Sequence, residues 1–212
     1  MVNTHPLTLF NNGAFMRIGV IAIQGDISEH VDALARALEE RGSSADIVTI
    51  KHKGIVPECD ALVLPGGEST TLGRLLIREG IAGEIRQMHL AGKPILGTCA
   101  GLILLAKEGD EQVKKTNQHL LGIMNTKVNR NAFGRQRESF ETGIDLPFLD
   151  SPYNAVFIRA PGIVECGKDV TILTQLDGMV VAAEQGNVLA LAFHPELTLD
   201  TRVHQYFLDK FI

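Results

Sequence analysis

A cysteine lies between two glycines in the segment Gly97-Thr98-Cys99-Ala100-Gly101, where one apolar run ends and another begins. This pattern is typical of a sharp strand-to-helix turn, which lifts a nucleophile above the edge of a sheet. The N-terminal end of the following helix favours the thiolate, the reactive form of cysteine. A structural cysteine in a tight turn is the alternative, since unpaired cysteine is often buried. The segment alone leaves both open.

A candidate base follows another apolar run, in the segment His194-Pro195-Glu196 after residues 188–193. In an open α/β sheet, functional groups gather at the carboxyl ends of strands, where Cys99 is also expected. A histidine there could take the thiol proton, and a carboxylate could hold the imidazole in the required tautomer. Such a motif alone is more typical of a surface loop. Together with Cys99, it predicts a catalytic triad.

A third segment, Pro65-Gly66-Gly67-Glu68-Ser69-Thr70, follows a further apolar strand. Its two glycines permit a backbone that aims N–H groups at a developing oxyanion. An ordinary strand-to-helix loop is the alternative, and we expect Ser69 or Thr70 to cap the helix in either case. Gln24 and Gly25 come after the first strand and are expected beside this loop.

The elements that must position these segments alternate between short apolar runs and helical patterns. Alternating strands and helices indicate a parallel sheet covered on both faces. In the first half, the strands are expected at 17–23, 45–50, 61–64 and 94–98, and the helices at 26–41, 70–79, 81–90 and 100–107. The first helix should bury a stripe of Val31, Leu34, Ala35 and Leu38.

The second half favours shorter strands, several of them antiparallel. They are expected at 127–129, 140–142, 155–158, 170–175, 179–184 and 188–193, with a closing helix at 201–211. The turn at Leu176-Asp177-Gly178 is typical of a hairpin. The predicted fold class is therefore α/β, with an open, mostly parallel sheet flanked by helices and additional antiparallel strands in the second half.

Composition narrows the possible functions. The 212 residues contain 45% hydrophobic and 21% charged residues, with a net charge of −5, which gives little support to nucleic-acid binding. The apolar runs are too short for a membrane span. We expect residues 1–15 to be an N-terminal extension outside the fold and residues 16–212 to form a single domain.

The remaining cysteines and histidines show no pattern of a cofactor or metal site. Cys59 and Cys166 lack a strand-to-helix turn and are expected to be inert, and an odd number of cysteines without a CxxC pair favours a reducing, cytoplasmic setting. Six histidines lack metal-ligand spacing and are expected to be structural or exposed: His5, His30, His52, His89, His119 and His204.

The segments PGGEST, GTCAGL and FHPEL, in this order, resemble the class I (triad-type) glutamine amidotransferases. From residue 16 onward the chain is similar to one branch of them, the glutaminase subunits of pyridoxal 5′-phosphate synthases. The segments AIQGDISEH, NRNAFGRQRESFE, FIRAP and AFHPELTLDTRVHQYF carry this narrower resemblance.

The resemblance implies roles for individual residues. Cys99 would be the nucleophile, His194 the base and acid, and Glu196 the carboxylate that orients it. The substrate-binding residues would be Gly67, Glu68, Ser69, Ala100, Arg130, Ile158 and Arg159, with the Gly67 and Ala100 N–H groups as the oxyanion hole. Arginine suits the α-carboxylate of glutamine because a guanidinium binds carboxylate in a fork.

The implied reaction hydrolyses L-glutamine to glutamate and ammonia through a cysteine thioester, with no cofactor. Ammonia would pass to a synthase subunit in a hetero-oligomer, which makes pyridoxal 5′-phosphate from ribose 5-phosphate and glyceraldehyde 3-phosphate. Three alternatives remain: a glutaminase subunit for another synthase, such as imidazole glycerol phosphate synthase; a stand-alone γ-glutamyl thiol hydrolase; and a non-catalytic module.

Overall fold

The computed structural model describes residues 16–25, 27–134 and 138–211, so the predicted N-terminal extension lies outside the described residues. The first half alternates strands with helices, as the sequence predicts. Its elements are β1 (Arg17–Ile21), α1 (Ile27–Glu40), β2 (Asp46–Ile50), the short 3₁₀ helix η1 (Val56–Glu58), β3 (Ala61–Leu64), α2 (Ser69–Arg78), α3 (Ile81–Leu90), β4 (Ile95–Thr98) and α4 (Ala100–Leu105).

The second half consists mostly of strands. In order, its elements are β5 (Ala106–Gly109), α5 (Glu111–Lys115), β6 (Met124–Asn129), β7 (Ser139–Ile144), β8 (Tyr153–Ile158), β9 (Gly162–Cys166), β10 (Thr171–Leu176), β11 (Met179–Gln185), β12 (Val188–Leu191), the 3₁₀ helix η2 (Pro195–Leu197) and α6 (Arg202–Phe211).

One long sheet joins the two halves. Within the described residues, its strand order is β2-β1-β3-β4-β12-β11-β9-β6-β5, with β10 paired to β11, while β7 and β8 form a separate ribbon. The first five strands in this order are all parallel, whereas β11 pairs antiparallel with β12, β10 and β9. The predicted fold class is confirmed.

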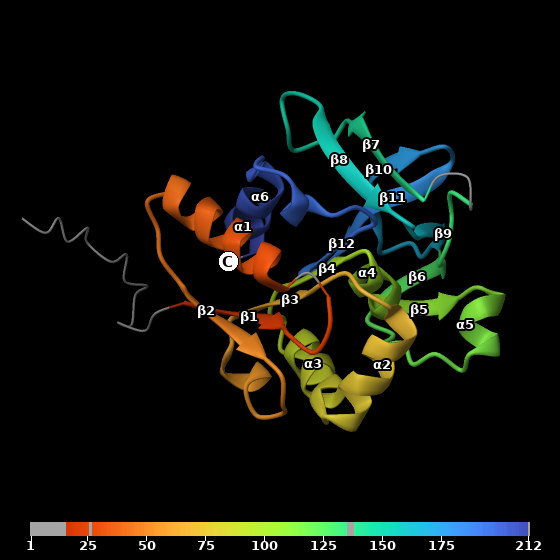
Figure 1. The fold of residues 1–212 in the computed structure, drawn as a ribbon, viewed down its shortest axis with the longest axis horizontal. Coiled ribbons are helices and arrows are strands. Elements are labelled where there is room, and N and C mark those ends of the chain that lie inside the picture. Colours follow the sequence, from red (N-terminus) through yellow and green to blue (C-terminus); the bar gives the residue numbers. More distant parts are fainter. Residues whose placement is uncertain (1–15, 26, 135–137, 212) are drawn as a thin grey trace, which may run out of the picture.

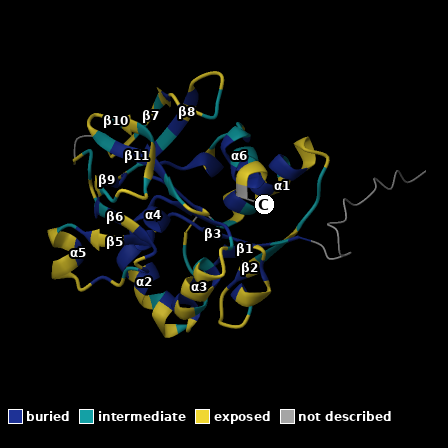
Figure 2. Cartoon of the chain, turned by 180° about the vertical axis from the view of Figure 1, so that it is seen from behind, coloured by how far each residue is buried: buried dark blue, intermediate teal, exposed yellow. Residues whose placement is uncertain are grey.

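Helices cover both faces of the parallel part of the sheet. Helices α1 and α6 lie on one side, and α2 and α3 lie on the other (Figure 1). Between these layers, every residue of β3, β4 and β12 is buried, as is every residue of the short helix α4. Figure 2 shows that the central strands are buried, whereas the outer faces of α2 and α3 are exposed.

Several sequence predictions are wrong in detail. The helix expected to reach Lys107 ends at Leu105, and the chain continues directly into strand β5, so Ala106 and Lys107 are extended. Strand β9 and helix α5 were not predicted. In α1 the buried face contains His30, Ala33, Leu34, Ala37 and Leu38, whereas the predicted Ala35 is exposed and Val31 is half-buried.

Candidate active site

Three loops that follow parallel strands meet at one edge of the sheet. Strand β4 leads into Cys99, β3 into the loop that contains Gly67, and β12 into His194. Because β4 lies between β3 and β12 in parallel register, the carboxyl ends of all three strands face the same way. The sheet topology thus brings together segments that are far apart in sequence, from Gly67 to His194.

Cys99 has the backbone geometry of a strained turn. Its φ is +49°, a left-handed conformation that is uncommon for residues other than glycine, and it is the N-cap of helix α4. Ala100 is the first helical residue, so its N–H belongs to the free N-terminal turn. Close packing requires the glycine that follows, because a Cβ on Gly101 would overlap the carbonyl oxygen of Leu64.

His194 joins the cysteine to a carboxylate. Its Nδ1 lies 2.7 Å from Glu196 Oε1, and its ring lines the same pocket as the Cys99 sulfur, with which it interacts electrostatically. His194 and Glu196 are each 3% exposed, so the pair is shielded from water. The structure therefore brings together the sulfur, the imidazole and the carboxylate that the sequence predicts as a triad.

The electrostatics of this cluster favour the charged forms. Burial lowers the pKa of His194, but the interactions with Cys99 and Glu196 outweigh this effect and raise the pKa to about 10. Burial likewise opposes ionisation of Glu196, yet hydrogen bonds from His194 and His30 hold the pKa of that carboxyl well below its usual range. A protonated imidazole beside the sulfur stabilises the thiolate.

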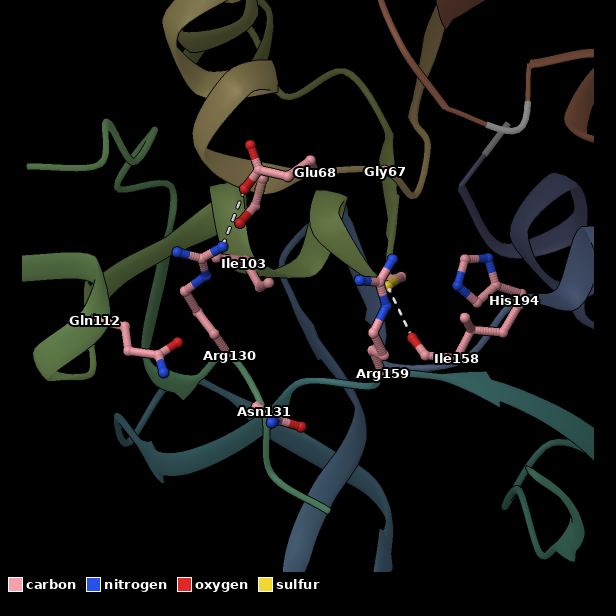
Figure 3. A pocket seen from close by; sticks show the side chains of 11 residues that line it. Gly67, Glu68, Ile103, Gln112, Arg130, Asn131, Ile158, Arg159 and His194 are labelled. Atoms are coloured by element: carbon pink, nitrogen blue, oxygen red, sulfur yellow. Dashed lines mark hydrogen bonds and ion pairs between the residues drawn. The ribbon is translucent and has the colours of Figure 1, made fainter. Parts of the chain in front are cut away.

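An open pocket with a volume of about 390 Å³ lies over the sulfur. Eight residues predicted from the sequence line it: Gly67, Glu68, Ser69, Cys99, Arg130, Ile158, Arg159 and His194. Figure 3 shows Arg159, Ile158 and His194 at one end and Glu68 with Arg130 at the other. Ala100 and Glu196 are buried behind this surface.

A backbone carbonyl group forms part of the pocket lining. The Cys99 sulfur lies 3.9 Å from the Ile158 carbonyl oxygen, so strand β8 closes one side of the pocket. Arg159, directly after that strand, has a φ of +42° and an exposed side chain. Because the backbone turns at Arg159, the Ile158 carbonyl faces the sulfur while the Arg159 side chain lies at the pocket opening.

The predicted helix cap in this pocket is wrong. Neither Ser69 nor Thr70 caps α2; the Glu68 carboxylate does, accepting hydrogen bonds from the backbone N–H groups of Thr70 and Thr71 at 3.0 and 2.7 Å. These hydrogen bonds outweigh the effect of burial and lower the pKa of Glu68 to about 2. Ser69 and Thr70 instead direct their hydroxyls to the buried Gln118 Oε1.

Gln24 and Gly25 lie against the Gly67 loop, as predicted. A Cβ built on Gly67 would contact the backbone of Gly25 and the side chain of Gln24. In the reverse direction, a Cβ on Gly25 would overlap the carbonyl oxygen of Gly66. The loop after β1 therefore supports the loop after β3, and only glycine fits at residue 25.

Sequence reasoning missed several residues at this site. Ile103, Gln112 and Asn131 also line the pocket. His30, expected to be structural or exposed, is fully buried with its Nε2 3.3 Å from Glu196 Oε1. One signal was available: His30, Leu34 and Leu38 are spaced four residues apart, so His30 falls on the buried stripe of α1.

Comparison with known proteins agrees with this geometry. The SNO glutamine amidotransferase family matches residues 20–212. Proteins named pyridoxal 5′-phosphate synthase subunit PdxT are 70% identical over 195 residues in Methanosarcina barkeri and 72% identical over 195 residues in Methanococcoides burtonii, each alignment covering 92% of this chain and 98% of the relative. The protein with that name in Archaeoglobus fulgidus is 55% identical and is covered to 97%.

Solved structures lead to the same class. A crystal structure described as a glutamine amidotransferase superposes with a TM-score of 0.80 at 44% identity, covering 91% of this chain and 97% of the other. A chain of PurLQS from Thermotoga maritima shares the fold, with a TM-score of 0.62 at 20% identity. This chain belongs to the SNO glutamine amidotransferase family, and the predicted resemblance is confirmed.

The described part of the chain contains no helix that is both long and apolar enough to cross a membrane.

Proposed function

We propose that this glutamine amidotransferase hydrolyses L-glutamine and supplies the ammonia to a pyridoxal 5′-phosphate synthase. The supporting observation is that Cys99 and His194 line one pocket of about 390 Å³, with His194 Nδ1 held 2.7 Å from Glu196 Oε1 behind it. The relatives at 50–72% identity over most of the chain, all named as subunits of that synthase, favour this acceptor over the alternatives.

The reaction begins at the sulfur. The Cys99 thiolate attacks the δ-carbon of glutamine, and the Gly67 and Ala100 N–H groups donate hydrogen bonds to the resulting oxyanion. Protonated His194 gives its proton to the departing nitrogen, so ammonia leaves and a γ-glutamyl thioester remains. Water then attacks the thioester while His194 takes its proton, which releases glutamate and regenerates the thiolate. Glu196 holds the imidazole throughout.

The pocket accommodates the rest of the substrate. Arg159 at the opening supplies a guanidinium for the α-carboxylate, and Arg130 with Glu68 forms the opposite end. Together with Ser69 and the Ile158 backbone, these groups bind the amino-acid end of glutamine and leave the side-chain amide at the sulfur.

The ammonia acceptor would be a separate synthase subunit that forms a hetero-oligomer with this chain and builds pyridoxal 5′-phosphate from ribose 5-phosphate and glyceraldehyde 3-phosphate. Binding on the active-site face would deliver ammonia directly. A cytoplasmic location is consistent with three unpaired cysteines. Residues 16–212 would act as a single glutaminase domain, without a metal or organic cofactor.

The decisive experiment traces the amide nitrogen. Glutamine labelled with ¹⁵N in the amide is supplied to the chain together with the synthase subunit and both sugar phosphates. The proposal predicts ¹⁵N in the pyridoxal 5′-phosphate ring and stoichiometric glutamate. Release of glutamate with no transfer of label would reject this acceptor, and the imidazole glycerol phosphate synthase subunit serves as the control partner.

A further inference from the structure

A second imidazole contacts the carboxylate of the triad. His30 on helix α1 places its Nε2 3.3 Å from Glu196 Oε1, the same oxygen that lies 2.7 Å from His194 Nδ1. The same Nε2 also lies 3.0 Å from the hydroxyl oxygen of Thr98, the residue directly before Cys99. His30 therefore touches both strand ends that carry the triad.

The contacts of Nε2 indicate which ring nitrogen of His30 carries a hydrogen. An unprotonated Nε2 would present its lone pair to a carboxylate oxygen, which is repulsive in a buried site. The Nε2–H tautomer instead donates toward Glu196 and Thr98, and leaves Nδ1 as an acceptor. Among the described residues, no hydrogen-bond partner lies at that Nδ1. An unpaired buried N–H there would be costly, so the geometry favours a hydrogen on Nε2.

The surroundings do not provide His30 with another role. Its ring is fully buried and packs edge-to-face on the ring of His204, at a centroid distance of 6.2 Å. It is also absent from the lining of the pocket, so it has no access to substrate. Within the described residues, its side chain makes polar contacts with Glu196 of the triad and with Thr98, the neighbour of Cys99.

We propose that His30 is a positioning residue, which fixes the Glu196 carboxylate and ties it to the strand end that carries Cys99. This inference rests on the proposed glutaminase function. A carboxylate held by one imidazole alone could rotate about its last side-chain bond, and the imidazole of His194 would then lose its alignment with the sulfur. The N–H of His30 removes that freedom, because it fixes Oε1 from a second direction.

The test compares two substitutions of similar size. His30→Gln keeps an N–H near the ε position, whereas His30→Met matches its length without a donor. Both are assayed for glutamine hydrolysis in complex with the synthase subunit. Because small misalignments of catalytic groups cost up to about 100-fold in rate, His30→Met should lower kcat roughly 10- to 100-fold, with KM changed less than about twofold. His30→Gln should restore most of kcat.

A second measurement tests the reactivity of Cys99 in the absence of glutamine. The rate at which iodoacetamide alkylates Cys99 in the free chain reports the thiolate, and it should fall in His30→Met but not in His30→Gln. Equal melting temperatures for the two variants exclude a folding defect as the cause.

The outcomes separate the two proposals. If both variants match the wild type in kcat, or both lose it equally, His30 does not position the triad, and the proposed function stands. If the wild-type complex itself releases no glutamate from glutamine, the proposed function fails, whatever the variants do.

Discussion

The Glu68 carboxylate makes an ion pair with the Arg130 guanidinium across one end of the pocket, with 3.1 Å between Oε1 and Nη2 (Figure 3). The same carboxylate caps helix α2. Arg130 is therefore held in place by Glu68, and both residues are expected to bind substrate. The two predicted contacts form one preorganised unit, which orients the guanidinium before glutamine arrives.

This double role predicts unequal costs when each partner is removed. Glu68→Ala loses two hydrogen bonds to the helix N-terminus and the ion pair, so it should lower the free energy of unfolding by about 1 kcal/mol. Arg130→Met loses only a partly exposed pair and should cost less than about 0.5 kcal/mol. Urea unfolding of both variants measures the difference. A larger loss for Arg130→Met would contradict the capping role.

Cys99→Ala should abolish glutamate release from glutamine, lowering kcat by at least about 10⁴-fold, because a methyl group cannot form the thioester. The fold and the binding of the synthase subunit should remain, since the side chain is small and mostly buried. Cys166→Ala is the matched control and should retain full activity. Turnover that survives in Cys99→Ala would refute the mechanism.

Glu196→Gln should lower kcat by about 10³- to 10⁴-fold with little change in KM. The amide keeps the shape of the carboxylate but no longer stabilises protonated His194, and its NH₂ group favours the wrong imidazole tautomer. Steady-state kinetics at saturating glutamine measures the effect, with circular dichroism to check the fold. A loss below tenfold would show that the carboxylate is not required.

Arg159→Ala should raise the KM for glutamine about tenfold or more and change kcat less, because the lost guanidinium contact to the substrate carboxylate is made equally in ground and transition states. Arg78→Ala on the exposed face of α2 is a control with an equally charged side chain. An unchanged KM in Arg159→Ala would remove this arginine from the substrate site.

His204 should make the protein sensitive to acid. Burial lowers its pKa from 6.5 to about 3. Above pH 6.5 the His204 side chain is neutral in both the native and the unfolded protein, so it contributes no pH dependence to stability. As the pH falls from 6.5 toward 3, the unfolded chain binds a proton that the native state does not. Stability then decreases by up to about 1.4 kcal/mol per pH unit.

His204→Leu should remove that slope. We expect the stability difference between pH 7.5 and pH 4.5, measured by urea unfolding, to be roughly 3 kcal/mol smaller than in the wild type. Other groups titrate in both proteins, so the comparison isolates this residue. His119→Gln, a change at an exposed histidine, should leave the difference as it is. An unaltered slope in His204→Leu would show that this imidazole is not kept neutral by burial.

The parallel half of the fold was predictable because its strands are short apolar runs separated by clear helical patterns. The failures lie where that contrast disappears. Leu104, Leu105 and Ala106 form one apolar run, yet the chain changes from helix to strand within it. Periodicity cannot locate such a change. Strand β9 was missed because its exposed residues, Val164 and Glu165, do not alternate with its buried ones.

The candidate site was predictable where a motif follows a strand. Cys99, Gly67 and His194 each do, and the topology brings them together. His30 could not be assigned in this way, because it sits inside a helix and meets Glu196 only through the packing of α1 against the strand ends. Its position on the buried stripe indicates burial, but the sequence does not show which group it contacts.

Strand β12 occupies the middle of the sheet although it is the last strand made. During synthesis, Cys99 therefore leaves the ribosome long before the strand that fills the gap between β4 and β11. Until β12 inserts between β4 and β11, the two halves of the sheet are not joined and the Cys99 sulfur has no imidazole beside it. A nascent or truncated chain that stops short of β12 should thus carry an ordinary thiol, and the reactive cysteine exists only in a completed protein.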